Sequence, residues 1–290
     1  MDEKKRKAQS VRAKLLNKAR KEERPFMELL QLYAMEKYLL RISKSDYTDD
    51  FVLKGALMLR TAGIGDLRPT RDIDFSKQQA DDAETLTHIF KECCEIAVEE
   101  DGLFFDPETM KSEEIRENQS YRGIRLTFRA TLGSARIPMQ IDIGFGDTIT
   151  PNPLLIEFPS ILGDEQPKLQ AYTFETAVAE KYEAMVQLDM ANSRMKDFYD
   201  IWYISNHIQL DPENLQNAIR QTFLRRGTEL PLEKPAALTD EFYEDQSKQM
   251  QWKAFIKKLH DGDCPKDLRE VIIYLEQLLW PVTQSITDQQ

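Results

Sequence analysis

Two aspartates, separated by one residue, are the first groups in this sequence that could do chemistry. Asp72 and Asp74 stand in the run Arg71-Asp72-Ile73-Asp74-Phe75. Side chains two positions apart on a strand lie on the same face, so both carboxylates point one way while Ile73 and Phe75 face a core. Two carboxylates held together repel each other unless a cation lies between them, and Mg²⁺ is bound by carboxylate oxygens. The pair therefore predicts a divalent-metal site, although acidic pairs also occur on solvated strand edges.

A third aspartate has the same kind of setting. Asp142 lies between Ile141 and Ile143, in a segment that reads as a strand, and strand interiors disfavour aspartate. Gly144 and Gly146 follow it and suggest a close approach of the backbone. If this strand lies beside the one that carries the acid pair, Asp142 becomes a third ligand for the same metals; otherwise it faces solvent at an edge.

The segment before the acid pair predicts a strand, a turn and a helix. Residues 51–54 are a short apolar run typical of a buried strand. Gly55 breaks that run, and a helix is predicted from Ala56 to Arg60. The first backbone N–H groups of a helix have no partner within it, so a phosphate could bind near Gly55 and Ala56. A loop with Gly63, Gly65 and Pro69 leads to the acid pair.

A lysine and a further aspartate lie on predicted helices downstream. Thr173 caps a helix on which Lys181 falls on the apolar side. A lysine in that position extends its ammonium group to solvent or meets an anion at a domain junction. Asp197 lies on the next helix, three residues after Arg194, where the two can form an ion pair.

The remaining pattern gives the elements that must position these groups. Amphipathic or helical composition covers residues 9–24, 28–42, 80–99, 194–204, 242–259 and 268–279. Strands are expected at 121–131 and 137–145, joined by Gly133-Ser134-Ala135 as a hairpin, with shorter ones at 103–105 and 154–158. Asp211 followed by Pro212 predicts a helix start, and Gly227 its end. We expect a first domain at 1–170 and a helical domain at 171–290.

Composition narrows the class of protein. The chain has 290 residues, three cysteines and three histidines. No apolar run is long enough for a membrane span, and the N-terminus does not read as a secretory signal. The three cysteines make no disulfide framework, so a reducing cytoplasm is expected. The three histidines are scattered and the cysteines lack the paired spacing of a zinc site, so structural zinc is disfavoured. The net charge is −11, yet residues 1–24 hold ten Lys and Arg against four Asp and Glu. That segment is either a solvated helix face or a contact for a phosphate backbone.

Several motifs, taken in order, carry a resemblance. The chain resembles the nucleotidyltransferase superfold shared with DNA polymerase β at three places: Lys54-Gly55-Ala56, the acid pair and Ile141-Asp142-Ile143. More narrowly, the chain is similar to the AbiEii/AbiGii toxin family of nucleotidyltransferases. That similarity is carried by RPTRDIDFS at 68–76, AVAEKYEAM at 177–185, RMKDFYDIW at 194–202, TFLRRGTELPLEKPAAL at 222–238 and QWKAFIKKL at 251–259. It spans about residues 50–260.

The resemblance implies an α+β fold, with a small mixed β-sheet flanked by helices and a helical C-terminal domain. It implies metal-dependent transfer of a nucleoside monophosphate from an NTP to an acceptor, expected to be the 3′ end of tRNA. Two Mg²⁺ ions are expected, with Mn²⁺ as an alternative. The protein would be the toxin of an abortive-infection type toxin–antitoxin system, a form of phage defence, with a cognate antitoxin as partner and no membrane association.

The resemblance also assigns roles to residues. The family's acidic pair falls on Asp72 and Asp74, its lysine on Lys181 and its later aspartate on Asp197. Lys181 would neutralise the leaving group, and Asp197 would orient Lys181 or contact the nucleotide. The expected metal ligands are Asp72, Asp74 and Asp142; the expected nucleotide contacts are Lys54, Gly55, Ala56, Leu57, Arg71 and Lys181.

The sequence departs from the family pattern in one respect and leaves two rival functions. Where the family often has Gly followed by Ser or Thr, this chain has Ala56 and Leu57, so backbone contacts to phosphate would be kept and a hydroxyl contact would not. One rival is a nucleotidyltransferase that modifies a small molecule such as an antibiotic. The other is a non-catalytic relative that only binds nucleotide or RNA.

Overall fold

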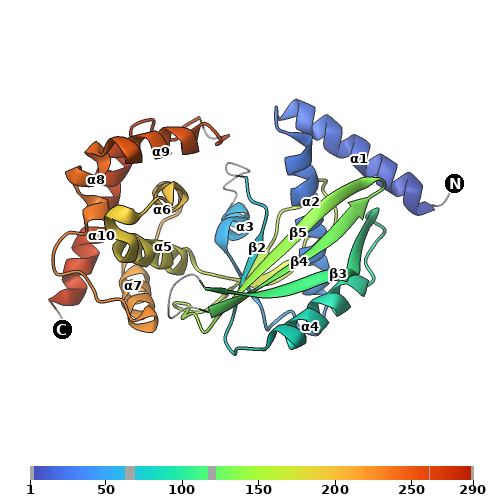
Figure 1. The fold of residues 1–290 in the computed structure, drawn as a ribbon, viewed down its shortest axis with the longest axis horizontal. Coiled ribbons are helices and arrows are strands. Elements are labelled where there is room, and N and C mark those ends of the chain that lie inside the picture. The colour runs from blue at the N-terminus through green and yellow to red at the C-terminus, as the bar shows by residue number, and fades with distance from the viewer. Residues whose placement is uncertain (1–2, 63–68, 117–121, 261, 289–290) are drawn as a thin grey trace. The chain divides into compact units, whose positions relative to one another are not determined.

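The computed structural model describes residues 3–62, 69–116, 122–260 and 262–288 (Figure 1). The chain forms two compact units. The first, here called the sheet unit, comprises residues 1–61, 70–146 and 154–171; the second, the helical unit, comprises 62–69, 147–153 and 172–290. Within the described residues, no helix is both long and apolar enough to cross a membrane.

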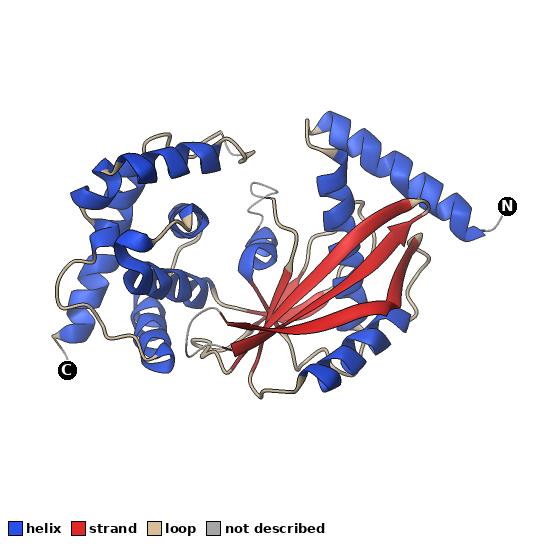
Figure 2. Cartoon of the chain, viewed as in Figure 1, coloured by secondary structure: helices blue, strands red, loops and turns tan. Residues whose placement is uncertain are grey.

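The sheet unit is built on one mixed sheet, red in Figure 2. Seven strands of the described chain pair in the order β3-β4-β5-β2-β1-β7-β6. Their bounds are β1 Val52–Lys54, β2 Ile73–Lys77, β3 Leu103–Arg116, β4 Arg122–Leu132, β5 Ala135–Phe145, β6 Leu154–Glu157 and β7 Lys168–Ala171. The β2–β5 and β1–β7 pairs are parallel and the other four are antiparallel. The predicted α+β fold with a mixed sheet is confirmed.

Helices pack against the sheet and bury one of its faces. The sheet unit contains α1 Glu3–Lys21, α2 Phe26–Ser43, α3 Gly55–Leu59 and α4 Ala83–Glu95. Helix α2 packs on β5 and β7, and α4 packs on β3. Aromatic rings fill the space beneath: Tyr38 of α2 lies 5.0 Å from the rings of both Phe105 and Phe128, and Phe51 lies 4.9 Å from Phe90. Burial of these large rings is the main favourable term that fixes the helices to the sheet.

The helical unit has six α-helices among its described residues. They are α5 Phe174–Leu188, α6 Met195–His207, α7 Pro212–Arg226, α8 Asp240–Glu244, α9 Gln246–Ile256 and α10 Leu268–Thr287. The predicted helix signals are confirmed. The Thr173 side chain accepts a hydrogen bond from the N–H of Thr176, and Asp211 caps α7 in the same way. Gly227 ends α7 in the left-handed conformation.

Three sequence predictions differ from the structure. Strand β3 runs for 14 residues instead of the three expected at 103–105. Its second half is rich in Glu, Lys and Ser, and only the ladder with β4 makes it a strand. Strand β7 lies at the boundary that we expected between the two domains, where no strand was predicted. The single helix expected at 242–259 is two, because Asp245 interrupts it and its carboxylate caps α9. The predicted loop glycines 63 and 65 lie outside the described residues.

Candidate active site

Three carboxylates converge at the centre of the sheet. Strands β2 and β5 run in parallel, with Asp74 directly beside Asp142. Asp72 comes one residue before β2. Each of the three offers a carboxylate oxygen that lies within 4.8 Å of the others, and all three side chains are half-buried. The condition that the sequence left open, that the two acid-bearing strands be neighbours, is therefore met.

The hydrophobic pattern explains why these strands pair in this register. Ile73, Phe75, Ile141 and Ile143 alternate with the acids and are fully buried. A shift of one residue would turn these apolar side chains to the open face and the acids into the core, so the register is strongly specified. The core beneath the sheet thereby places the acids together on the other face.

Asp142 has a partner that the sequence analysis did not identify. Arg125 of β4 lies directly opposite Asp142, and its Nε and Nη2 donate to the two carboxylate oxygens at 2.8 and 2.7 Å. Gln140 donates weakly to the same carboxylate, at 3.2 Å. The hydrogen bond to Asp142 raises the pKa of Arg125. A cation that binds Asp142 must therefore compete with, or share, this two-pronged contact.

The glycine turn lies directly against the acid pair. Gly55 has a φ of +69°, and a Cβ atom at this position would lie 2.0 Å from a carboxylate oxygen of Asp74. Helix α3, which starts there, is only five residues long. In its first turn the Leu57 side chain is buried, so only its backbone could face a ligand. On the other acid, the Thr70 hydroxyl donates to Asp72 at 2.7 Å.

The two predicted cationic contacts beside these acids lie at the edge of the same region. Arg71 directly precedes Asp72 and is exposed, while Lys54 ends β1 opposite Asp74 and is half-buried. Ala56 begins α3 with its side chain half-buried. The structure therefore gathers Lys54, Gly55, Ala56, Arg71 and the three acids within the sheet unit.

Lys181 belongs to an ion cluster in the helical unit. Its ammonium lies 3.2 Å from Asp197 and 2.8 Å from Asp200, both fully buried carboxylates of α6. Arg194 reaches the other oxygen of Asp197 at 2.7 Å. Asp197 thus contacts Lys181 directly. Asp200, 2.8 Å from the same ammonium, is the closer of the two aspartates; the three-residue spacing from Asp197 puts both on one helix face and is the signal that points to it.

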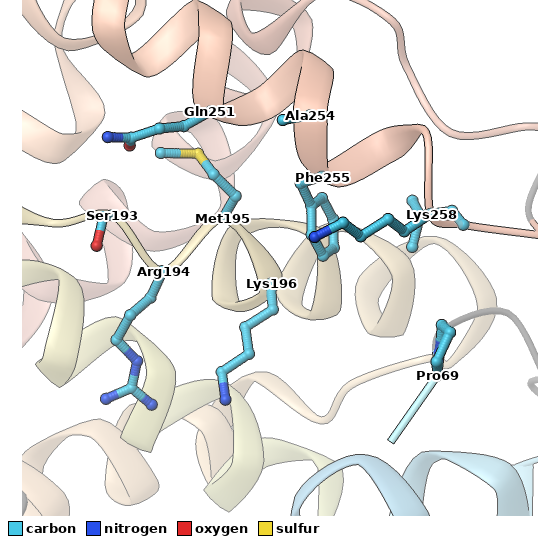
Figure 3. Close-up of a pocket in the computed structure, with 10 residues that line it drawn as sticks. Pro69, Ser193, Arg194, Met195, Lys196, Gln251, Ala254, Phe255 and Lys258 are labelled. Atoms are coloured by element: carbon cyan, nitrogen blue, oxygen red, sulfur yellow. The ribbon is translucent and has the colours of Figure 1, made fainter. Parts of the chain in front are cut away.

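A pocket opens beside this cluster (Figure 3). It has a volume of about 520 Å³, and Arg194 and Lys196 at the start of α6 line it together with Phe255 and Lys258. The Gln251 side-chain oxygen is buried and has no hydrogen-bond partner among the described residues. An aromatic ring, cationic groups and a buried acceptor suit a planar ligand that carries hydrogen-bond donors and negative charge.

A mixed sheet that presents acids from two adjacent strands beside a glycine turn is the arrangement expected from the resemblance to nucleotide-transferring enzymes. The comparison with known families identifies the particular family. The family model described as nucleotidyl transferase AbiEii toxin, type IV toxin–antitoxin system, matches residues 37–273. The chain belongs to this family and is a nucleotidyltransferase. The family implies an NTP as substrate and an antitoxin as partner.

A solved structure supports the fold. A crystal structure of a proposed nucleotidyltransferase from H. pylori matches with a TM-score of 0.52 and 14% identity, covering 91% of this chain and 97% of that one. The structure of JHP933 from Helicobacter pylori matches with a TM-score of 0.47 and 14% identity, covering 87% and 90%. No curated protein matches this sequence. At such low identity, the likeness to the first structure concerns the fold alone.

Proposed function

We propose that this enzyme transfers a nucleoside monophosphate from an NTP to the 3′ end of an RNA, expected to be tRNA, with divalent metal ions held by Asp72, Asp74 and Asp142. The observation that carries the proposal is the convergence of the three carboxylates within 4.8 Å of one another. Family membership supplies the reaction class.

The donor set fits Mg²⁺. All three ligands are carboxylate oxygens, the kind that this hard cation prefers, and the half-buried setting leaves room for substrate oxygens. Three acids this close repel one another unless a cation or proton intervenes. When bound, a pair of such ions would lower the pKa of the acceptor hydroxyl and stabilise charge on the transferring phosphoryl group. Mn²⁺ has similar ligand preferences and is the expected substitute.

The chain's own residues supply binding and orientation. The absence of a side chain at Gly55 lets the backbone lie against Asp74, and the peptide N–H groups of Gly55, Ala56 and Leu57 are proposed contacts for the triphosphate. Lys54 and Arg71 are proposed to contact phosphate oxygens. Because Thr70 donates to one Asp72 oxygen, it fixes which oxygen of that carboxylate is left for a ligand.

Lys181 is proposed to neutralise the charge that builds up on the leaving pyrophosphate. Its contacts with Asp197 and Asp200 hold the ammonium in one orientation. Loss of either aspartate would leave Lys181 less firmly held, so we assign Asp197 a positioning role. A separation of effects follows: Lys181→Ala lowers kcat, whereas Asp197→Asn acts through Lys181 and has no effect in the Lys181→Ala background.

The proposal is tested by incubating the protein with each α-labelled NTP, Mg²⁺ and total tRNA. We expect label at the RNA 3′ end, dependent on Mg²⁺ and abolished by a chelator. Asp74→Ala should lower the rate at least about 100-fold, because metal ligands act chiefly on the transition state. Transfer by Asp74→Ala at the parent rate would refute the metal assignment.

The same assay with aminoglycosides in place of tRNA tests the small-molecule alternative. Label on the aminoglycoside and none on RNA would replace the proposed acceptor while leaving the metal site intact. Co-expression of the toxin with the neighbouring candidate antitoxin, and growth after phage challenge, tests the proposed role in phage defence.

A further inference from the structure

The sheet unit carries a polar surface that leads away from the three acids. On β4, Arg125, Thr127, Arg129 and Thr131 point to the face that the helices leave open, and the residues between them are buried. On β5 the same face carries Arg136, Pro138, Gln140 and Asp142. The register pairs Asp142 with Arg125, Gln140 with Thr127, Pro138 with Arg129 and Arg136 with Thr131. We call this face the β4–β5 track.

Helix α1 lies at the far end of this track (Figure 1). Gly102, next to β3, packs so closely on Ala8 that an added Cβ would lie 2.8 Å from the Ala8 Cα, and Gly133 of the β4–β5 hairpin also faces Ala8. The buried stripe of α1, which includes Val11 and Leu15, fixes the helix by one side. Its other side is therefore held at a defined place beside the sheet.

The exposed side of α1 is strongly basic. The helix has nine Lys and Arg and a single acid, Glu3, in a chain whose net charge is −11. Seven of these cations are exposed: Lys4, Lys5, Arg6, Arg12, Lys14, Arg20 and Lys21. Among the α1 cations of the described chain, only Lys18 forms an ion pair with an acidic side chain, that of Glu22 at 2.7 Å. A cluster of unneutralised positive charge on an acidic protein creates a local field that attracts polyanions.

A pocket joins α1 to the end of the track. It has a volume of about 590 Å³ and is lined by Lys4, Lys5 and Arg12 from α1 and by Phe104 and Thr131 from the sheet, among others. Phe104 is 49% exposed and lies under the Lys4 ammonium, 5.3 Å from the ring centre. The basic groups of this pocket suit the phosphate oxygens of a nucleic-acid backbone, and the exposed ring adds a flat apolar contact beside them.

The length of the track decides which acceptor it fits. Eight residues separate Ser134 at the hairpin from Asp142, which corresponds to about 26 Å of extended strand. An NTP or an aminoglycoside is too short to contact both ends. A base-paired RNA stem advances by roughly 3 Å per base pair, close to the spacing in DNA, so about eight or nine pairs cover the distance. Acids border the track on β3. Glu113 lies 3.8 Å from Arg125, and Asp106 is opposite Arg129 in the β3–β4 register.

We propose that the β4–β5 track and the exposed side of α1 bind the sugar–phosphate backbone of a base-paired stem in the RNA acceptor, so that its 3′ end lies at the three acids. This rests on the proposed function, because it takes the acceptor to be RNA. Helix α1 lies outside the matched residues 37–273, whereas β4 and β5 lie inside them, so family membership does not by itself supply the α1 part of this surface.

The binding test uses the full chain with Asp74→Asn, so that no transfer occurs during measurement. The track variant adds Lys5→Gln, Arg12→Gln and Arg136→Gln. The control variant adds Lys44→Gln, Lys91→Gln and Lys168→Gln, which remove the same charge from the residue after α2, from α4 and from β7 of the sheet unit. Binding of a 5′-fluorescein tRNA transcript is followed by anisotropy at several salt concentrations, and circular dichroism confirms that both variants are folded.

We expect the track variant to lose about tenfold or more in affinity at low salt. The slope of log affinity against log salt should fall by two to three, about one for each phosphate contact removed. The control should lose less than about threefold. Equal losses in the two variants would show that only net charge matters and would overturn the proposal, as would unchanged binding by the track variant.

A transfer assay separates this proposal from the proposed function. In the otherwise unaltered protein, the track variant should slow labelling of tRNA and leave labelling of a single-stranded pentanucleotide unchanged, because the short RNA cannot reach α1. If neither RNA is labelled by the parent protein, the proposed acceptor is wrong, and the anisotropy result alone decides on the track. If both RNAs are slowed equally, the track is wrong and the acceptor assignment stands.

Discussion

The backbone at Gly55 leaves no room for a side chain beside Asp74. A methyl group there would lie 2.0 Å from the Asp74 carboxylate, and the residue's φ of +69° is itself strained for any residue with a Cβ. We predict that Gly55→Ala displaces the Asp74 carboxylate and lowers transfer at least about tenfold, while the strain costs about 1–2 kcal/mol of stability. Transfer to tRNA and urea unfolding measure the two effects.

Gly163 provides the matched control for that substitution. It also has a positive φ, +77°, but nothing lies within 4 Å of where its Cβ would be. Gly163→Ala should therefore show the loss of stability without the loss of transfer. If the two alanine variants retain equal activity, the close approach to Asp74 has no part in catalysis.

Arg125 should affect how the enzyme depends on metal. Its contacts occupy both oxygens of Asp142, so Arg125→Gln makes that carboxylate easier for Mg²⁺ to reach. The pair is partly exposed and worth about 1 kcal/mol at most, which corresponds to a roughly fivefold lower Mg²⁺ concentration for half-maximal transfer. The titration is run at saturating RNA, with Arg129→Gln, two positions along β4, as the control. A Mg²⁺ requirement that rises in Arg125→Gln would mean that the arginine orients Asp142 for the metal instead of competing for it.

Among single residues, the sequence predicted those whose role follows from their immediate neighbours in the chain. The alternation of acids with Ile and Phe predicted that Asp72 and Asp74 share a face, and the glycine break at 55 was visible too. Arg125 was not predicted, because its contact with Asp142 depends on strand pairing between residues 17 apart. The closeness of Gly55 to Asp74 depends on the β1–β2 register in the same way.

Two helices of the helical unit are joined by a buried ion pair. Glu183 of α5 is fully buried, and its two oxygens accept from Arg226 of α7 at 2.8 Å and from Thr228 at 2.5 Å. Burial by itself would lower the pKa of Arg226, but the carboxylates of Glu180 and Glu183 outweigh it and raise that pKa. A raised pKa stabilises the fold at every pH below the ordinary pKa of an arginine side chain, so this contribution does not vary between pH 5 and 9.

Removal of one partner from that pair should be costly. We predict that Glu183→Gln lowers the free energy of unfolding by about 3 kcal/mol, because Glu180 alone is then left to neutralise the Arg226 charge. Urea unfolding at pH 7 measures the loss, and Glu229→Gln, an exposed acid nearby, should change it by less than about 0.5 kcal/mol. A loss as small as that of the control would show that water replaces the carboxylate.

Elements with strong local signals were predicted, and those defined by distant partners were not. Helix α7 has a proline after its cap and a glycine at its end, and both boundaries follow from residue chemistry. The polar half of β3 and the four residues of β7 have no such pattern, since each becomes a strand only by pairing with β4 or with β1 and β6.

In the molecule as a whole, the three acids lie at the join between two groups of strands. Strand β2 brings β1, β7 and β6, and β5 brings β4 and β3. Their mutual repulsion therefore opposes the pairing on which the sheet depends. The residue pattern predicted the acids, and the family resemblance predicted the mixed sheet. The order of the strands creates this conflict between stability and function, and no single segment of the sequence predicts that order.

This conflict predicts a gain in stability when one acid is removed. Asp72→Asn should raise the free energy of unfolding of the full chain in EDTA by about 0.5–2 kcal/mol, the range that single stabilising substitutions commonly give. Mg²⁺ should raise the melting temperature of the parent protein, since it binds only the folded state, and should do so far less in Asp72→Asn. Asp46→Asn removes the same charge at an exposed position and should behave like the parent in both respects. Equal stabilisation of Asp72→Asn and the parent by Mg²⁺ would place the metal somewhere other than at the three acids.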